Sequence, residues 1–327
     1  MIISKTPFRI SFVGGGSDLP DFYQRGYGAV VSSAIDKFVY LALHQFFERK
    51  FVLKYSQTEN CDTIGAIQHP LIRECLLATE TRDFLEITSF ADIPSLGSGL
   101  GSSSAFSVGL IHALLARQGR MPSHETCAAR ACEVEIDRLK EPIGKQDQYA
   151  AAFGGMNYIR FNADGSVHID PIIFDLETRA ELEKRLVLFY TGITRNASGI
   201  LAEQRQNIVS DPRRFDTLCR MRDQADELRA ALAQGNLGAI GTMMHEGWLL
   251  KKQMASGVSS PHLDEVYRRG LAAGATGGKI LGAGGGGFFL FYTEPGRRES
   301  LIRELGDLRH IDFRLERQGT RIIYVGD

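Results

Sequence analysis

A run of glycine and serine between a strand-like segment and a helix-like segment constrains this 327-residue chain more than any other feature. Apolar periodicity predicts a strand over 84–90 and a helix over 103–116. Alternating glycines let backbone amides turn inward, and the N-terminus of the following helix adds unpaired N–H groups and a positive dipole end. This order predicts a loop that binds phosphate oxygens, with serine hydroxyls that can also bind Mg²⁺; a flexible loop without a ligand is the alternative. The run reads Pro94-Ser95-Leu96-Gly97-Ser98-Gly99-Leu100-Gly101-Ser102-Ser103-Ser104-Ala105.

Other glycine-containing segments do not form familiar nucleotide loops. A Walker loop needs Ser or Thr after its lysine, whereas Lys145 is followed by Gln and Lys279 by Ile. The tract 282–287 has the spacing of a dinucleotide-binding loop, but the strand-like segment 288–292 follows it where that loop needs a helix. Because apolar residues flank the tract, we expect its glycines to let two backbones, or a backbone and a ligand, approach closely. A plain linker is the alternative.

Three charged residues are candidates for chemistry. Asp147 lies among polar residues, where a carboxylate can accept the proton of an attacking hydroxyl; an exposed or capping Asp is the alternative. Arg9 lies in a predicted strand over 8–13, where a charge is costly unless it is paired or functional; a surface-facing position is the alternative. Asp18 follows three glycines and can bind ligand hydroxyls or form an ordinary Asx turn.

A predicted helix over 123–139 carries three acidic residues at alternate positions, Glu133, Glu135 and Asp137. Residues at alternate positions of a helix do not share one face. We therefore expect at most one of these carboxylates to face a bound metal, and the others to be solvated.

Both halves of the chain mix strand-like and helix-like segments, which predicts an α+β protein. The length favours two domains that share a cleft, and the charged stretch 177–185 is a candidate boundary. We therefore expect domains over 1–180 and 181–327. Further strands are predicted over 29–44, 186–191 and 321–325, and further helices over 213–234, 237–255 and 261–273.

Composition argues against several classes of function. A net charge of -1 gives no broad basic field for nucleic acid. No apolar run approaches the roughly 20 residues that span a bilayer, so we expect no membrane segment. Five cysteines form no Cys-x-x-Cys pair and no export signal is visible, so we expect reduced thiols and a cytoplasmic protein.

Three separated motifs resemble those of the GHMP kinases, a family named for galactokinase, homoserine kinase, mevalonate kinase and phosphomevalonate kinase. The resemblance covers essentially the whole chain. It implies ATP as the phosphoryl donor, an N-terminal domain like domain 2 of ribosomal protein S5, and a ferredoxin-like C-terminal domain. The motifs are Pro7-Phe8-Arg9-Ile10-Ser11-Phe12-Val13-Gly14-Gly15-Gly16-Ser17-Asp18, the loop 94–105, and Lys279-Ile280-Leu281-Gly282-Ala283-Gly284-Gly285-Gly286-Gly287-Phe288.

The resemblance also implies a role for each motif. It makes Asp147 the catalytic base and places Arg9 near the transferred phosphate or the acceptor oxygen. It places Mg²⁺ on Glu135 and on Ser103 or Ser102. The implied ATP-binding residues are Pro94, Gly97, Ser98, Gly99, Leu100, Gly101, Ser102, Ser103 and Ser104. The implied acceptor-binding residues are Gly15, Gly16, Ser17, Asp18, Gly284 and Gly285.

Within the family, the segments 14–18, 144–149 and 191–195 look like those of kinases that phosphorylate the anomeric hydroxyl of a heptose 7-phosphate. The product of those kinases feeds nucleotide-activated heptose for surface polysaccharides. Galactokinases carry Glu-His where residues 15–16 stand, so galactose is not the expected acceptor. A sugar phosphate would give a cation a distal phosphate to bind, and the candidates are Arg195, Lys251 and Lys252.

Two alternatives remain open from the sequence. A fucokinase-like or other sugar 1-kinase would share the same motifs and act on a sugar without a phosphate. A non-catalytic sugar-sensing relative would bind ATP and sugar to signal to a partner. A monomer and a homodimer are both compatible with the sequence.

Overall fold

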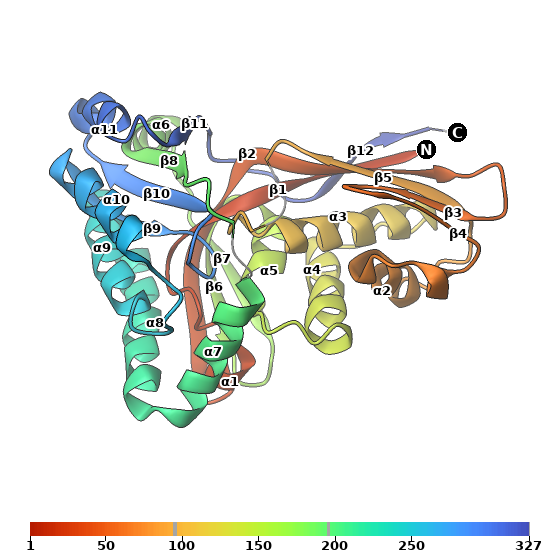
Figure 1. Cartoon of the computed structure of the whole chain (residues 1–327), viewed down its shortest axis with the longest axis horizontal. Helices are drawn as coiled ribbons and strands as arrows, with labels where there is room; N and C mark the ends of the chain where they lie inside the picture. Colours follow the sequence, from red (N-terminus) through yellow and green to blue (C-terminus); the bar gives the residue numbers. More distant parts are fainter. Residues whose placement is uncertain (94–96, 195–196, 327) are drawn as a thin grey trace.

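Two β-sheets organise the computed structural model, which describes residues 1–93, 97–194 and 197–326 (Figure 1). The larger sheet has the strand order β12-β1-β2-β5-β3-β4, with β6 pairing with β2 and β7. The smaller, antiparallel sheet has the order β11-β8-β10-β9. The larger sheet contains β1 (Ile2–Val13), β2 (Tyr27–Gln45), β3 (Phe51–Lys54), β4 (Thr58–Cys61), β5 (Leu85–Ala91), β6 (Met156–Asn162), β7 (Val167–Pro171) and β12 (Arg321–Val325). The smaller contains β8 (Leu186–Tyr190), β9 (Ala275–Ile280), β10 (Phe288–Thr293) and β11 (Arg309–Ile311).

Polar side chains cap several of the helices at their N-termini. Ser123, Asp175 and Ser260 each accept a backbone N–H three residues further along, which satisfies an orphan donor of the first turn. The α-helices are α1 (Pro20–Tyr23), α2 (Pro70–Ala78), α3 (Ser102–Arg117), α4 (His124–Cys132), α5 (Gln146–Phe153), α6 (Leu176–Arg185), α7 (Ala197–Ser210), α8 (Pro212–Ala233), α9 (Gly238–Lys251), α10 (Pro261–Ala272) and α11 (Arg298–Glu304). Short 3₁₀ turns span Ile64–Ala66 and Pro295–Arg297, and a π-helical turn spans Glu133–Arg138.

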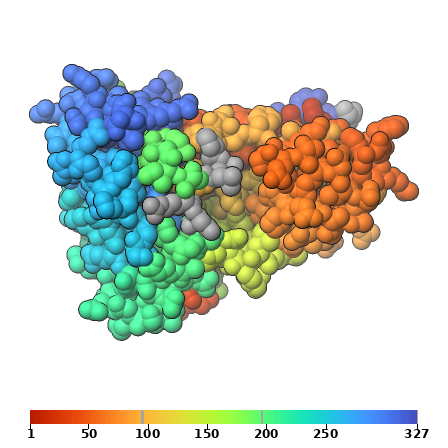
Figure 2. Space-filling view, viewed as in Figure 1, coloured from red at the N-terminus to blue at the C-terminus, as the bar shows by residue number. Residues whose placement is uncertain are grey.

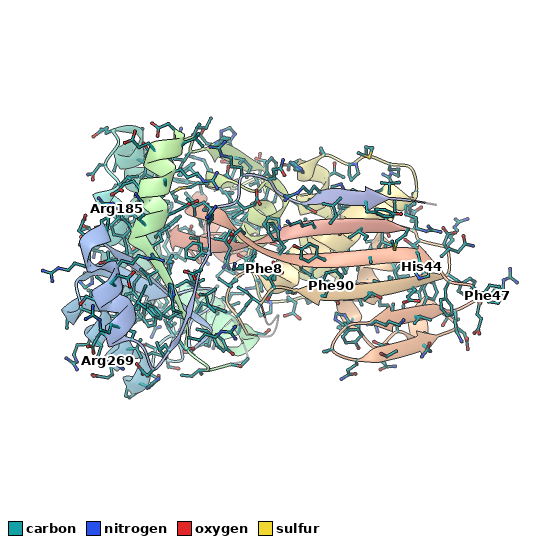
Figure 3. The ribbon with its side chains drawn as sticks, turned by 90° about the horizontal axis from the view of Figure 1, so that it is seen from above. Phe8, His44, Phe47, Phe90, Arg185 and Arg269 are labelled. Carbon is teal, nitrogen blue, oxygen red and sulfur yellow. The ribbon has the colours of Figure 1, made fainter. Side chains whose placement is uncertain are left out.

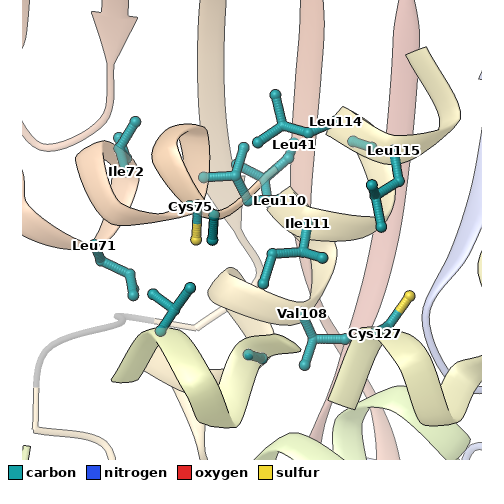
Figure 4. Packing of buried hydrophobic residues seen from close by; sticks show 14 of the residues in the cluster. Leu41, Leu71, Ile72, Cys75, Val108, Leu110, Ile111, Leu114, Leu115 and Cys127 are labelled. Atoms are coloured by element: carbon teal, nitrogen blue, oxygen red, sulfur yellow. The ribbon is translucent and has the colours of Figure 1, made fainter. Parts of the chain in front are cut away.

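Helices α2, α3 and α4 cover one face of the larger sheet (Figure 1). Alternate residues of β2, such as Leu41 and Leu43, point to this face and are fully buried. Ile111 and Leu114 of α3 belong to the same cluster, and Cys75 of α2 lies beside the leucines of α3 (Figure 4). This cluster fixes α3, and with it the position of the loop that precedes α3.

A second hydrophobic core joins the two halves of the chain. Phe8 of β1 lies in one cluster with Leu188 of β8, Leu228 of α8 and Leu290 of β10. Phe8 lies in the middle of the molecule, between the helices of the second half and the part of the larger sheet that carries Phe90 (Figure 3). The space-filling view shows the later residues, green to blue, directly against residues of the first half (Figure 2). The halves therefore share buried apolar surface.

The chain returns to the larger sheet at its end, because β12 pairs with β1 in an antiparallel register. Residue 180 lies inside helix α6, so the charged stretch 177–185 is helical. A boundary at 180 stays a prediction, and β12 belongs by pairing to the sheet of the first half.

The other strands and helices expected from the sequence agree with the structure within about four residues, except that the first strand begins at Ile2 and one helix differs locally. The helix expected over 123–139 is α-helical as far as Cys132 and then widens into the π-helical turn Glu133–Arg138. This turn lies beside the candidate site described below, as is frequent for π-turns. In the described residues, no helix is long and apolar enough to cross a membrane.

Candidate functional site

The loop that precedes α3 has the backbone that its glycines predict. Gly97, Gly99 and Gly101 have φ of 65°, 73° and 72°, a left-handed conformation that glycine adopts without strain. Gly101 is the N-cap of α3, so the unpaired amides of a 16-residue helix begin at the end of the loop. Ser98 and Ser102 lie 3.2 Å apart between their hydroxyl oxygens. This arrangement suits phosphate oxygens.

The two glycine-rich tracts pack against each other backbone to backbone. A Cβ atom on Gly99 would lie 2.4 Å from the carbonyl oxygen of Leu281, and one on Gly287 would lie 2.5 Å from that of Ser98. The expectation of close backbone approach is therefore confirmed. Gly285 donates its N–H to the carbonyl of Val258 at 2.8 Å, away from the pocket described below.

Arg9 and Asp147 form a bidentate ion pair directly beside the loop. The Arg9 Nε and Nη2 atoms each donate to an Asp147 carboxylate oxygen at 2.7 Å, and Nη1 donates to the carbonyl of Gly99 at 2.5 Å. A Cβ on Gly101 would lie 3.3 Å from both side chains. Arg9 is 3% exposed and paired, so the surface-facing alternative is wrong. Asp147 stands in the first turn of α5, where the helix dipole favours a negative charge.

Asp18 lies across the same pocket and ties the triple-glycine turn to α5. Its Oδ1 accepts the N–H of Gly16 at 3.1 Å, and its Oδ2 accepts the N–H of Gln146 at 3.0 Å. Burial raises the pKa of Asp18, and the negative charge of Asp147 raises it further. Ser17 instead bonds the backbone of Ala29 through its hydroxyl and is fully buried, so its role here is structural.

The pocket contains polar side chains that the sequence did not single out. Ser11 donates to the Gln146 side-chain oxygen at 3.2 Å, and Gln146 Nε2 donates to Asp147 at 3.1 Å. Gln204 of α7 is 3% exposed and occupies the space that a side chain at Gly16 would need, since a Cβ there would lie 2.4 Å from Gln204 Nε2. Ser11, Gln146 and Lys279 lie within segments that the family resemblance quoted, but no role was assigned to them, and Gln204 lies in none of those segments.

Lys251 and Lys252, the two neighbouring lysines expected at the site, point in different directions. Lys251 is 6% exposed, lines the pocket and donates to the carbonyls of Ile280 and Gly282. Burial, with the positive charge of Arg9, lowers the pKa of Lys251 to about 7. Lys252 points outward and forms an ion pair with Asp264 at 3.1 Å, so the structure does not bring it to the pocket.

Of the three acidic residues considered for a metal, Glu133, Glu135 and Asp137, only Glu135 is buried. Its carboxylate is 1% exposed and accepts bonds from Ser103 Oγ at 2.7 Å and from Gln148 Nε2 at 2.5 Å. Burial raises the pKa of Glu135, so a cation beside it would favour the ionised form. A carboxylate and a hydroxyl fit Mg²⁺, which takes few protein ligands when phosphates supply oxygens.

Two expected site residues, Pro94 and Arg195, lie outside the described residues. Of the expected residues, one pocket between the halves of the chain brings together Arg9, Gly15, Gly16, Asp18, Asp147 and Lys251. The loop 97–104 lies beside this pocket, through Gly99 and Gly101, while Glu135 and Gly284 do not line it. The lining of the pocket comprises Arg9, Ser11, Gly15, Gly16, Asp18, Leu19, Ile143, Gly144, Gln146, Asp147, Leu201, Gln204, Lys251, Lys279, Gly282 and Ala283. A phosphate loop, a carboxylate base and a second carboxylate for hydroxyls are the parts that phosphoryl transfer to an alcohol needs.

Comparison with known proteins gives two family matches: GHMP kinases N terminal domain over residues 64–155 and GHMP kinases C terminal over residues 228–308. A D-glycero-alpha-D-manno-heptose 7-phosphate kinase from Campylobacter jejuni is 29% identical over 98% of this chain and 98% of its own length. A bifunctional fucokinase/GDP-fucose pyrophosphorylase from Arabidopsis thaliana is 25% identical over 91% of this chain, which spans 30% of that protein.

Among solved structures, a D-glycero-D-manno-heptose 1-phosphate kinase from Bacteroides thetaiotaomicron superposes with a TM-score of 0.82. The two chains are 24% identical, and the match covers 100% of each. This likeness shows that they share a fold.

Proposed function

The chain belongs to the GHMP kinases, and from that membership we propose that it is a sugar kinase that transfers the γ-phosphoryl group of ATP to the anomeric hydroxyl of D-glycero-α-D-manno-heptose 7-phosphate. The product is the 1,7-bisphosphate, a precursor for nucleotide-activated heptose and surface polysaccharide.

One observation carries the proposal: the Arg9–Asp147 pair lies between the glycine loop and the pocket that holds Asp18. A hydroxyl bound in this pocket has a carboxylate beside it and the phosphate loop directly behind that carboxylate. Arg9 holds the Asp147 carboxylate with two bonds and so fixes its orientation. The geometry supports phosphoryl transfer to an alcohol, because the pocket for the acceptor and the loop for the phosphates of ATP both adjoin the Asp147 carboxylate.

In the proposed step, the sugar O1 forms a bond to the γ-phosphorus while the bond from that phosphorus to the β–γ bridging oxygen breaks. The O1 proton passes to Asp147, and ADP leaves with the electron pair of the broken bond. Arg9 and the amides at the start of α3 stabilise the negative charge on the phosphoryl oxygens. Ser103 and Glu135 would hold Mg²⁺, which supplies further charge neutralisation when it is bound.

The pocket supports a sugar as the acceptor. The oxygens of the Asp18 carboxylate can accept hydrogen bonds from sugar hydroxyls, and the side-chain amides of Gln146 and Gln204 can donate and accept hydrogen bonds. A Cβ on Gly15 would contact only side-chain atoms at 3.7 Å or beyond, so this position leaves room for an acceptor. The Campylobacter jejuni relative supports heptose 7-phosphate as that acceptor.

A panel of acceptors tests the proposal. ATP consumption is measured with heptose 7-phosphate, free heptose and fucose, and the position of the new phosphate is read by NMR. We expect heptose 7-phosphate to give the highest kcat/KM and a phosphate on C1. Faster turnover of fucose would favour a fucokinase-like activity, the alternative that the similarity to the Arabidopsis thaliana fucokinase suggests. Binding of ATP and sugar without turnover would favour a sensor instead.

A further inference from the structure

Two buried lysines line the pocket without a carboxylate partner among the described residues. Lys251 and Lys279 are 6% and 5% exposed, and neither forms an ion pair within residues 1–93, 97–194 and 197–326. Their ammonium groups donate to backbone carbonyls instead: Lys279 to Phe12 at 3.1 Å, and Lys251 to Ile280 and Gly282. A buried ammonium group with only neutral partners is costly.

The charges of the pocket are therefore unbalanced. Its lining carries Arg9, Lys251 and Lys279 against the carboxylates Asp18 and Asp147, and Asp147 is already engaged by Arg9. The pKa of Lys279 is lowered well below its usual value by burial and then by the charges of Lys251 and Arg9. An anion that enters the pocket would relieve this repulsion and restore the charge of both lysines.

Backbone contacts place the ammonium group of Lys251 close to the phosphate loop. Lys251 binds the carbonyl of Gly282, and a Cβ on Gly282 would lie 2.6 Å from the Cα of Gly99. Gly99 in turn accepts a bond from Arg9. Lys251 is thus one backbone contact away from the loop, on the side where the Arg9–Asp147 pair lies.

We propose that Lys251 and Lys279 form the cationic part of a buried site for the phosphoryl group while it passes from ATP to the acceptor. This inference rests on the proposed kinase function and assigns a catalytic role to Lys279. It also moves Lys251 from an expected distal-phosphate contact to the reaction centre. Cations placed where charge develops in the transition state raise kcat more than they lower KM.

Lys251→Met and Lys279→Met test this assignment, because Met has a similar length and no charge. We expect each variant to lower kcat about 100-fold or more while the KM for ATP changes about threefold or less. Lys184→Met, at an exposed position of α6, is the control and should match the wild type. Lys251→Arg and Lys279→Arg keep the charge and should retain more activity than the Met variants.

Proton uptake provides a second readout that does not depend on turnover. Inorganic phosphate is titrated into the protein at about pH 8 in buffers of different ionisation enthalpy, where a lysine with a pKa of about 7 is largely neutral. We expect phosphate to bind with uptake of protons, and Lys251→Met to reduce that uptake. Arg9, Asp18, Asp147 and Lys279 are the charged groups that surround Lys251 in the pocket.

The outcomes separate the two proposals. Phosphate binding with proton uptake in a protein that phosphorylates no sugar would support the anion site and overturn the proposed kinase function. An active wild type whose Met variants keep full kcat would overturn the lysine assignment. So would variants that lose activity and melting temperature together with unchanged proton uptake, because this pattern indicates that the lysines only satisfy backbone carbonyls. Failure of the wild type to bind phosphate would also overturn it.

Discussion

At the scale of single residues, Asp147 is the group on which the proposed chemistry depends. Asp147→Asn keeps the size of the side chain but cannot take the proton of the acceptor hydroxyl. We expect kcat to fall about 100-fold to 10,000-fold, the range for loss of a general base, with ATP affinity nearly unchanged. Steady-state kinetics and calorimetric titration of ATP measure the two quantities. A variant with substantial kcat would remove Asp147 from the role of base.

Asp18 gives a pH-dependent prediction at the same scale. Its folded-state pKa lies above the ordinary value of 3.8 because the carboxyl is buried, so the folded protein holds this proton more tightly than the unfolded chain. The corresponding stability is present below pH 3.8 and is lost as pH rises through the folded-state pKa. Asp18→Asn does not titrate. We therefore expect its melting temperature to rise relative to the wild type as pH increases above about 4, while its activity falls.

Differential scanning fluorimetry at a series of pH values above 3.8 measures the difference between Asp18→Asn and the wild type. All other titrating groups are common to both proteins, so they largely cancel in the difference. A difference that does not change with pH would show that Asp18 has the same proton affinity in the folded and unfolded protein. Loss of sugar binding in the same variant, with ATP binding retained, would connect the buried carboxylate to the acceptor.

At the scale of elements, the contact between the two glycine tracts sets the distance from the loop to the rest of the pocket. Gly99→Ala would place a Cβ 2.4 Å from the Leu281 carbonyl oxygen and also strain a φ of 73°. Gly119→Ala is a matched control, because its φ is 72° and no atom lies within 4 Å of the added Cβ. We expect Gly119→Ala to cost about 1 kcal/mol of unfolding free energy, and Gly99→Ala roughly 2 kcal/mol or more.

Chemical denaturation measures both costs, and a kinase assay on the same variants completes the comparison. The excess cost of Gly99→Ala over the control isolates the clash from the backbone strain. Its activity should fall as well, because the loop must shift relative to Arg9 and Asp147. Equal destabilisation by the two substitutions would show that the tracts are free to move apart.

The elements also show what the sequence could predict and why the rest was out of reach. Local patterns predicted α3, its loop and β10, because periodicity and glycine placement act within one segment. The family match confirms the two-part fold that the motifs implied. Gln204 gave no local signal, since its approach to Gly16 depends on how α7 docks against the first half. Lys251 and Lys252 both fall in a predicted helix, about 100° apart, but the sequence does not show which face of that helix packs toward the pocket.

At the scale of the whole molecule, the shared core implies that the two halves unfold together. Apolar residues of β1 and of the smaller sheet lie in one cluster, and Asp226 of α8 accepts hydrogen bonds from Tyr27 and Tyr158 of the larger sheet at 2.7 Å and 2.5 Å. Strand β12 adds a second connection, because it carries the chain from the second half back to β1. Neither half can expose this surface without loss of its own core.

The chain offers one probe for each half. Trp248, the single tryptophan, is fully buried in α9 and reports on the second half. The first half contains four buried free thiols, whose reactivity with a thiol reagent reports its unfolding: Cys61, Cys75, Cys127 and Cys132. Cys219→Ser removes the partly exposed thiol of α8 and leaves the reagent specific for the first half. We expect the two probes to give coincident denaturation midpoints.

Leu228→Ala in the shared core sharpens this test. Leu228 is fully buried, so its truncation should cost about 2 to 5 kcal/mol of unfolding free energy. If the halves form one cooperative unit, the fluorescence midpoint and the thiol midpoint shift by the same amount, although the substitution lies only in the second half. A shift of the fluorescence midpoint alone would mean that the halves are independent units. In that case the pocket between them could open without unfolding of either half.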